Sequence, residues 1–379
     1  MKLVYLAQSE VPSQTANSVH VMKMCDAFAA QGVETSLWLP GWQAEVDTTQ
    51  AYEFYGVQRR FQLRWLPVVP WLKSSYAYAW QVWVHLALGK EQADLVFSRS
   101  LLGAAAALLA GRELVLEVHE PMRHSGRLQG LMFDWIVRHK RFRRLVVITH
   151  ALKDWHLQHN LLPEALILVA PDGADVPPEL EPQVLGSGQI RLQLGYVGSL
   201  HQGKGVELLL PLAKALPDVD VHVVGGSGEQ LQAWKRKAEG ISNVHFHGFM
   251  KPAQAHGFML GMDALLAPNQ RVVKGVGGSD IGRWTSPLKI FEYMAARRPI
   301  LASDLPVLRE VLDDGRNCLL ADAENVEAWC ANVHRLQAEA GLAARLADNA
   351  YADLQGRFSW ACRAKGLLSA VMATEEQVS

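Results

Sequence analysis

Two lysines in the second half of the chain lie in sequence surroundings suited to phosphate. Lys204 is part of the stretch LGYVGSLHQGKGVELL, which starts as an apolar strand, passes through several glycines and continues as a helix. Backbone N–H groups and a helix N-terminus bind phosphate oxygens, and the lysine adds a positive charge. The spacing from Gly198 to Lys204 also fits a nucleotide-hydrolase loop, but Gly205 stands where that motif needs a hydroxyl for magnesium. The stretch argues against ATP hydrolysis, and by itself a tight turn with a solvated lysine explains it equally well.

The stretch TSPLKIFEYMAARRPILASDLP is the strongest signal in the chain. Ser286 is expected to cap a helix that has Pro287 at its first position. Lys289 and Glu292 are three residues apart, so both lie on one face of that helix. The carboxylate suits a pair of sugar hydroxyls, and the lysine with the helix N-terminus suits phosphate. The competing interpretation is an ordinary surface ion pair.

The first half of the chain places chemistry at the ends of two apolar segments. His119 follows the strand LVLEV, and Arg99 ends another predicted strand, so both are expected at the carboxyl edge of one sheet. An isolated histidine is usually structural, but this position favours a ligand contact. Arg99 is a candidate contact for an acceptor or a phosphate. The four cysteines show no metal-ligand spacing, and cations of the protein can replace a metal at a diphosphate, so we predict a site without metal.

The elements that position these residues alternate between short apolar strands and helices. This rhythm predicts an α/β chain with parallel sheets, and 379 residues predict two domains. The turn-rich run from Ala170 to Gln189 is expected to link them. We predict a Rossmann-like domain over 1–185, a second over 186–357 and a C-terminal helix over 358–379 that crosses back to the first domain. Ligands are expected where the carboxyl ends of the two sheets face each other.

Composition narrows the classes of function. A hydrophobic content of 49% and a charged content of 20% are typical of a soluble globular protein, and the net charge of −1 does not favour nucleic acid. The N-terminus reads as a first strand rather than a signal peptide, and the cysteines fit a reducing cytoplasm. No apolar stretch is long enough to span a bilayer, so any membrane contact would be peripheral, at the inner face.

Two surface segments leave alternatives open. Residues 65–86 concentrate six aromatic side chains, which suit a lipid-linked acceptor or a bilayer, although a helix packed on its own sheet is the more ordinary interpretation. The basic run RHKRFRR at 138–144 suits anionic lipid or a solvated helix end, and the solvated end is slightly favoured.

Taken together, these stretches resemble glycosyltransferase family 4, whose members have the GT-B fold. TSPLKIFEYMA with RPILASDLP resembles the donor-site helix of that family, and GYVGSLHQGKGVELL resembles its phosphate loop. NSVHVMKMCDAFAAQG, LEVHEP, VVITHALKD and VAPDGAD resemble further family segments in the same order. The resemblance extends over nearly the whole chain, which makes it far more specific than any single motif.

The resemblance implies particular roles for individual residues. Lys204 would stabilise the leaving nucleoside diphosphate, Glu292 would hold the donor ribose, and His119 would approach the donor sugar at the reacting centre. The remaining donor-site residues implied by the resemblance are Ala16, Asn17, Gly198, Ser199, Gly226, Phe249, Met250, Ser286, Pro287, Leu288 and Lys289. Ala16 and Asn17 take the small-residue positions of a loop before the first helix, where Asn tolerates positive φ. The residues after Gly248 read the base through backbone groups.

Three positions depart from the family pattern. Trp284 stands where many members carry a first glutamate, so contact with the donor sugar must come from elsewhere, for example from Asp280 or backbone groups. Ser199 replaces an arginine that follows the first glycine of the phosphate loop. Arg297 replaces the glycine that usually ends the donor helix.

The functional hypothesis is a retaining transfer of a hexose from a nucleoside diphosphate sugar, UDP or GDP, to a saccharide or lipid-linked saccharide. Such a protein needs no cofactor and would work in the synthesis of cell-surface polysaccharide or glycoconjugate. The alternatives are a GT-B epimerase or phosphorylase and a catalytically silent sugar-nucleotide-binding or scaffold subunit. Trp284 and Ser199 motivate the hypothesis of a catalytically silent subunit.

Overall fold

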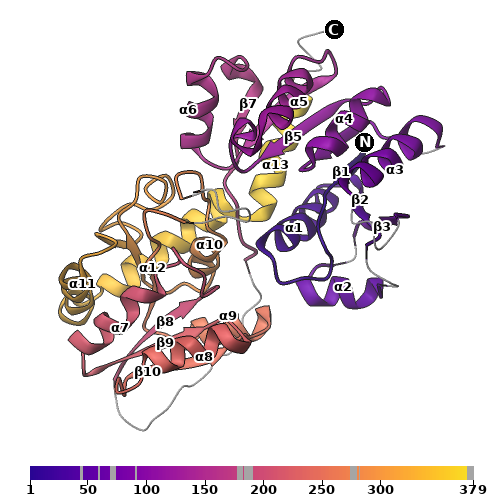
Figure 1. Ribbon diagram of the computed structural model, residues 1–379. Helices are drawn as coiled ribbons and strands as arrows, with labels where there is room; N and C mark the ends of the chain where they lie inside the picture. The colour runs from indigo at the N-terminus through magenta and orange to yellow at the C-terminus, as the bar shows by residue number, and fades with distance from the viewer. Residues whose placement is uncertain are drawn as a thin grey trace. The chain divides into compact units, whose positions relative to one another are not determined.

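The computed structural model describes residues 1–42, 46–58, 60–68, 74–89, 92–176, 182, 191–273, 280 and 282–373. The chain divides into two compact units, each with its own parallel sheet. Unit 1 comprises Met1–Asp172 together with Trp360–Ser379, and unit 2 comprises Gly173–Ser359. In Figure 1, unit 1 therefore contains both the indigo start of the chain and the yellow helix α13.

The sheet of unit 1 has seven parallel strands in the order β3-β2-β1-β4-β5-β6-β7. Their bounds are β1 Lys2–Leu6, β2 Glu34–Pro40, β3 Gln62–Leu66, β4 Leu95–Ser98, β5 Leu114–Val118, β6 Phe142–Val147 and β7 Ile167–Val169. The strand order reverses between β1 and β4, which pair from Leu3 opposite Leu95 to Leu6 opposite Ser98. In doubly wound sheets, ligands bind outside the carboxyl ends of the strands at such a reversal.

The helices of unit 1 form two groups. Their bounds are α1 Ala16–Ala30, α2 Thr48–Tyr55, α3 Ser75–Leu88, α4 Leu101–Leu109, α5 Arg127–Val137, α6 His150–Gln158 and α13 Trp360–Met372, with 3₁₀ turns at Met122–Ser125 and Glu164–Leu166. Helix α1 packs against α2 and α13, whereas α4 packs between α3 and α5 (Figure 1). The C-terminal helix thus completes the first unit, as the sequence predicts.

The sheet of unit 2 has six parallel strands in the order β10-β9-β8-β11-β12-β13. Their bounds are β8 Leu192–Val197, β9 Val219–Val224, β10 Val244–Gly248, β11 Ala264–Ala267, β12 Ile300–Ser303 and β13 Leu319–Ala321. The helices are α7 Val206–Ala215, α8 Gly228–Lys237, α9 Pro252–Leu260, α10 Leu288–Ala295, α11 Val326–Ala338 and α12 Leu342–Asp353, followed by a π-turn at Leu354–Phe358. Here the order reverses between β8 and β11.

The alternation of side chains along the strands explains the two cores of unit 2. On β9, Val219, Val221 and Val223 join a cluster with α7 and α11, whereas Val224 joins the cluster beneath α9 and α10. Apolar runs of this kind are typical of parallel strands that are covered on both faces. The predicted α/β class with two Rossmann-like units is therefore confirmed.

Among the described residues, no helix combines the length and the apolar composition needed to cross a bilayer. The four cysteines, which all lie in described parts of the chain, are free thiols. Most of the predicted linker, 177–181 and 183–190, lies outside the described residues.

Candidate functional site

The loop between β8 and α7 is shaped by glycines at the point where the strand order of unit 2 reverses. Gly203 and Gly205 have φ of +87° and +83°, a region that side chains disfavour. A Cβ on Gly205 would lie 1.6 Å from the Pro268 carbonyl oxygen, and one on Gly203 would lie 2.5 Å from the Val272 oxygen. The loop therefore lies directly against the segment that follows β11, and only glycine fits at the two contacts.

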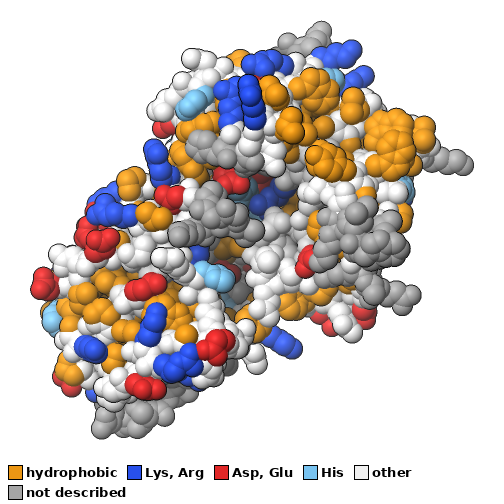
Figure 2. Space-filling model, viewed as in Figure 1, with side chains coloured by type: hydrophobic (Ala, Val, Ile, Leu, Met, Phe, Trp, Pro, Cys, Tyr) orange, Lys and Arg blue, Asp and Glu red, His pale blue; other side chains and the backbone are white. Residues whose placement is uncertain are grey.

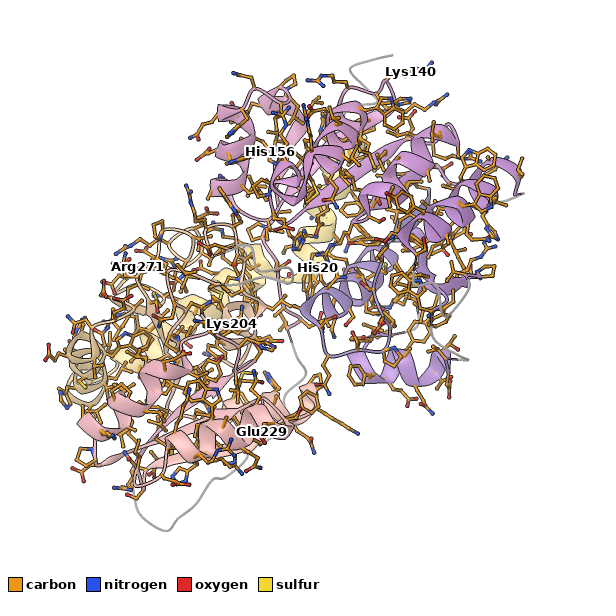
Figure 3. The ribbon with its side chains drawn as sticks, viewed as in Figure 1. His20, Lys140, His156, Lys204, Glu229 and Arg271 are labelled. Carbon is orange, nitrogen blue, oxygen red and sulfur yellow. The ribbon has the colours of Figure 1, made fainter. Side chains whose placement is uncertain are left out.

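Lys204, which Figure 3 labels, belongs to this loop, and its charge acts on Lys289 of α10. Burial lowers the pKa of Lys204. Burial, together with the nearby charge of Lys204, lowers the pKa of Lys289 to about 7, although Glu292 opposes the shift. The Lys289 ammonium lies 4.4 Å from the centre of the Tyr196 ring, and among the described residues its Nζ has no hydrogen-bond partner. Two partly desolvated cations side by side form a site for an anion of multiple charge.

Two tyrosines, which the sequence analysis did not single out, hold the loop and the lysines in place. The Tyr196 hydroxyl donates to the Ser199 carbonyl oxygen at 2.6 Å. The Tyr293 hydroxyl accepts from the Val197 N–H at 2.8 Å and donates toward the carbonyls of Val197 and Leu266, each at 3.2 Å. A tyrosine within an apolar strand or helix is the only sequence signal for these contacts.

The start of α10 differs from the predicted capping. The helix begins at Leu288, and Pro287 rather than Ser286 occupies the N-cap position, with no side-chain cap among the described residues. Proline lacks a hydroxyl that could bind first-turn N–H groups, and the prediction that Ser286 occupies the N-cap position was wrong. Within this first turn the Ile290 N–H donates to the Pro287 carbonyl oxygen at 3.0 Å, and Leu288 and Lys289 precede it. Glu292 lies one turn further on and is half-buried.

A second glycine-rich loop, after β9, rests on the phosphate loop. A Cβ on Gly225 would lie 1.8 Å from the Gly198 carbonyl oxygen, and one on Gly226 would lie 2.4 Å from a Leu200 methyl. Gly248 at the end of β10 accepts from the Gly225 N–H at 2.8 Å. Phe249, which follows, is 43% exposed, whereas Met250 packs against the core of unit 2. The three loops named by the sequence analysis therefore meet at one edge of the sheet.

The residues that depart from the family pattern have local roles. Trp284 is buried, and the Arg283 guanidinium lies 5.1 Å from the centre of its ring. The Asp280 Oδ1 accepts from the N–H groups of Val273 at 3.1 Å and Gly282 at 2.9 Å, so this oxygen organises its own loop. Arg297 has φ of +49°, the left-handed conformation that a glycine would adopt after a helix.

The candidate site in unit 1 lies at the start of α1. The helix begins at Ala16, and Thr15 caps it through a bond from the Ser18 N–H. Ala16 and Asn17 therefore belong to a right-handed first turn and not to the predicted loop, and Asn17 does not adopt positive φ. Asn17 lines a cavity of about 160 Å³ with residues at the ends of β4 and β5. The other lining residues are Arg99, Leu101, Leu116, Glu117, Val118, His119, Glu120 and Met122.

His119 is held between an anion and a cation in this cavity. Its Nε2 lies 2.7 Å from the Glu117 Oε1, and its Nδ1 lies 3.1 Å from the Arg99 Nη2. Burial and the Arg99 charge lower the pKa of His119 to about 4, although Glu117 opposes this. The ring is therefore neutral at pH 7, and the Arg99 Nη2 lies near both ring nitrogens, 2.9 Å from Nε2 and 3.1 Å from Nδ1.

Glu117, which the sequence analysis treated only as a strand residue, is the centre of the largest buried charge network of the described residues. Its Oε2 accepts from Arg363 of α13 at 2.9 Å, and its Oε1 lies 3.0 Å from the His20 Nε2. The His20 Nδ1 lies 2.8 Å from the Asp172 Oδ1. Burial alone would raise the pKa of Glu117, but Arg363 and His20 lower it well below its usual range. The carboxylate is therefore ionised.

His20, which Figure 3 labels, offers a metal ligand together with Glu117 and His119, since their donor atoms lie within 4.8 Å of one another. Both Glu117 oxygens, however, already face cations, from Arg363 and from the Arg99 Nε at 3.5 Å. A divalent ion would have to lie beside two guanidinium groups. The arrangement suits an ion-pair network better than a metal centre.

Comparisons with known proteins agree with this architecture. Residues 18–176 match the family described as Glycosyltransferase Family 4, and residues 191–339 match Glycosyl transferases group 1. A phosphatidyl-myo-inositol mannosyltransferase of Mycobacterium leprae is 27% identical over 49% of this chain and 47% of its own length. The corresponding protein of Mycolicibacterium smegmatis is 24% identical over 60% of this chain and 57% of its own length. The chain thus aligns with about half the length of these relatives.

A solved structure of Anabaena HepE in complex with UDP-glucose superimposes with a TM-score of 0.72, at 16% identity, over 98% of this chain and all of that one. At this identity the superposition establishes the fold alone. The two family matches together cover most of the chain, in the order that the sequence motifs predict. The chain belongs to the family 4 glycosyltransferases of group 1 and has the GT-B fold.

Proposed function

We propose that this protein transfers a hexose, with retention at the anomeric carbon, from a nucleoside diphosphate sugar to a hydroxyl of a saccharide or lipid-linked saccharide. One observation carries the proposal: at the glycine-rich loop a buried Lys289 lies near a half-buried Lys204, and the Lys289 ammonium has no hydrogen-bond partner among the described residues. A diphosphate would neutralise both cations and would lie at the N-terminus of α10.

The donor is proposed to be a UDP-hexose bound by unit 2. The HepE structure that superimposes on the chain contains UDP-glucose, and the curated relatives are named mannosyltransferases, so the sugar is left at the level of a hexose. Glu292 would accept from the ribose hydroxyls, and the backbone at Phe249 and Met250 would face the base. Ser286 and Pro287 would lie beside the phosphates, as would Ser199 and the glycines at 198 and 226.

The proposed chemistry is charge stabilisation. As the bond between the anomeric carbon and the diphosphate oxygen breaks, the electron pair leaves with the diphosphate, where Lys204 and Lys289 stabilise it. His119 and Asn17 would contact the donor sugar. Because His119 is neutral and already bonded through Nε2 to Glu117, it would act as a polar contact rather than as a proton donor. The acceptor hydroxyl forms the new bond to the anomeric carbon and gives its proton to the departing diphosphate oxygen.

The experiment compares Lys204→Ala with Lys214→Ala, a change at an exposed lysine in the last turn of α7. Thermal-shift measurements with UDP, GDP and dTDP first identify the base, and turnover of the matching sugar nucleotides is then followed with a cell extract as acceptor. We expect Lys204→Ala to lose turnover by at least about a hundredfold, the range found when one stabilising donor is removed, while Lys214→Ala retains it. Near-normal turnover by Lys204→Ala would refute the assignment.

A catalytically silent sugar-nucleotide-binding subunit is the second candidate. The buried Trp284 and the uncharged Ser199 favour it, since both stand where family members usually carry charge. Donor hydrolysis without acceptor separates the two functions. Binding of a sugar nucleotide without hydrolysis or transfer would support the silent subunit and exclude the transferase. We also propose that the protein acts in the cytoplasm and needs neither a metal ion nor a cofactor.

A further inference from the structure

Helix α3 of unit 1 is apolar on its outer face as well as on the face that it buries. Tyr76, Trp80, Val84 and Leu88 recur every four residues along one side of the helix. Of these, Tyr76 and Leu88 are each 73% exposed and Trp80 is 60% exposed. The opposite side is buried through Tyr78, Val82 and Leu86. A helix that is apolar all round is normally enclosed by protein or lipid, and α3 is enclosed on one side only.

The two neighbouring helices extend this surface. On α5, Leu128, Leu131 and Trp135 recur at the spacing of one helix face and are exposed, by 76% in the case of Leu128. Leu109 is exposed at the end of α4, and the Arg112 guanidinium just beyond it donates to the Leu86 carbonyl oxygen at 2.7 Å, which joins the ends of α3 and α4. We call this surface the apolar face. It consists of Tyr76, Trp80, Leu88, Leu109, Leu128, Leu131 and Trp135.

Figure 2 shows hydrophobic side chains gathered over the region where Figure 1 draws α3, α4 and α5, with lysine and arginine side chains along its upper border. Residues 127–144 contain six basic residues and one acidic residue, in a chain whose total net charge is −1. Arg141 and Arg143 pair with Glu113, whereas Arg127 and Lys140 are exposed and have no ion pair within the described part of the chain. The border of the apolar face is therefore positively charged.

We propose that the apolar face docks on an anionic lipid bilayer. Aromatic side chains with a polar edge, such as Tyr76 and Trp80, favour the boundary between lipid headgroups and acyl chains. Lysine and arginine beside such a surface bind anionic headgroups. Helix α3 has only 14 residues, so it would lie in the interface and would not span it. A second copy of the chain or a protein partner would not require a positively charged border along one side of the apolar face.

The test is co-sedimentation of the full chain with vesicles of phosphatidylcholine, with or without phosphatidylglycerol. We expect binding only when phosphatidylglycerol is present, and we expect it to weaken at high salt. Arg127→Gln with Lys140→Gln should weaken binding about thirtyfold, since each basic residue at such a surface contributes about fivefold. Lys235→Gln, a change at an exposed lysine of α8 in unit 2, is the matched control and should bind as the wild type does.

The apolar contribution is tested by Trp80→Ser with Leu131→Ser, against Met372→Ser, which changes an exposed apolar side chain of α13 in the same unit. The double variant should lose sedimentation at every vesicle concentration while its melting temperature is unchanged. Binding that is equal for both variants would overturn the proposal, as would a concentration-dependent dimer that disappears in the double variant. The vesicle assay contains neither donor nor acceptor, so its result does not depend on whether the protein transfers a sugar.

Discussion

Lys289 makes a quantitative prediction about how the diphosphate binds. Its pKa in the free protein is about 7, because the ammonium is buried beside Lys204. At pH 8 a group with this pKa is only about one-tenth protonated. A bound diphosphate would return the pKa toward its usual value above 10, so the ammonium would be fully charged in the complex. Binding should therefore take up about 0.9 proton at pH 8 and about 0.5 at pH 7.

The sign of the pH dependence follows from the same shift. Because the ligand raises the pKa of Lys289, the affinity should be greatest below pH 7 and should fall by up to about tenfold per pH unit above it. The lowered pKa of Lys204 adds to this trend. Isothermal titration calorimetry with UDP in two buffers of different ionisation enthalpy measures the proton uptake directly. The UDP phosphates are deprotonated at pH 8 and contribute little to it.

Lys289→Met is the decisive variant for this prediction. It should remove the proton uptake and flatten the pH profile, and it should be at least as stable as the wild type without ligand, because a buried cation without a hydrogen-bond partner is replaced by an apolar side chain. Lys251→Met, at an exposed lysine before α9, is the control and should keep the uptake. Uptake of less than about 0.2 proton at pH 8 in the wild type would show that no lysine of lowered pKa meets the diphosphate.

Three further predictions concern stability and are checked by chemical denaturation. Arg297→Gly should raise the free energy of unfolding by up to about 1 kcal/mol, because relief of the left-handed conformation outweighs an exposed ion pair with Asp348; a decrease would contradict this. His156 is buried, has no hydrogen-bond partner among the described residues, and has a pKa that burial lowers to about 4. The folded protein therefore keeps this ring neutral, and the stability that this provides is complete above pH 6.5 and is lost as the pH falls toward 4. Wild-type stability should fall by about 2 kcal/mol between pH 7.5 and pH 5 through this group, and His156→Leu should remove that share; an unchanged acid dependence would refute it. Arg363→Met should cost about 3–5 kcal/mol by leaving Glu117 buried without its main partner, and addition of Glu117→Gln should restore part of the loss; full additivity of the two changes would contradict the pairing.

The strands could be predicted because parallel strands that are covered on both faces are short apolar runs. Leu114–Val118 matches β5 at both ends, and the other predicted strands differ from the observed ones by a few residues. Strand β3, with Gln62, Arg64 and Trp65, was not predicted, since its polar and aromatic composition lacks a continuous apolar run. The chain passes between the units at Asp172, earlier than position 185, because the turn-rich run contains no signal for where packing ends.

The candidate site was predicted where its residues are contiguous in sequence and was missed where they are not. The two loops around Lys204 and Lys289 contain glycines and helix starts that can be read locally. The contact between Glu117 and Arg363 joins residues 246 positions apart, and neither residue type is unusual in its own segment. Ala16 and Asn17 were predicted in a loop before the first helix, whereas the capping bond of Thr15 begins α1 at Ala16.

The return of α13 to unit 1 affects the order in which the protein can form during synthesis. Residues 1–172 emerge from the ribosome long before Arg363 does, and until then Glu117 has no guanidinium from α13 beside it. A nascent chain halted within unit 2 would therefore carry a first unit whose Glu117 carboxylate lacks its Arg363 partner and an α1 whose contacts with α13 are not yet made. Unit 2 is continuous in sequence and can complete its own fold first. Unit 1, whose main segment is synthesised first, is therefore completed last, when α13 has been made.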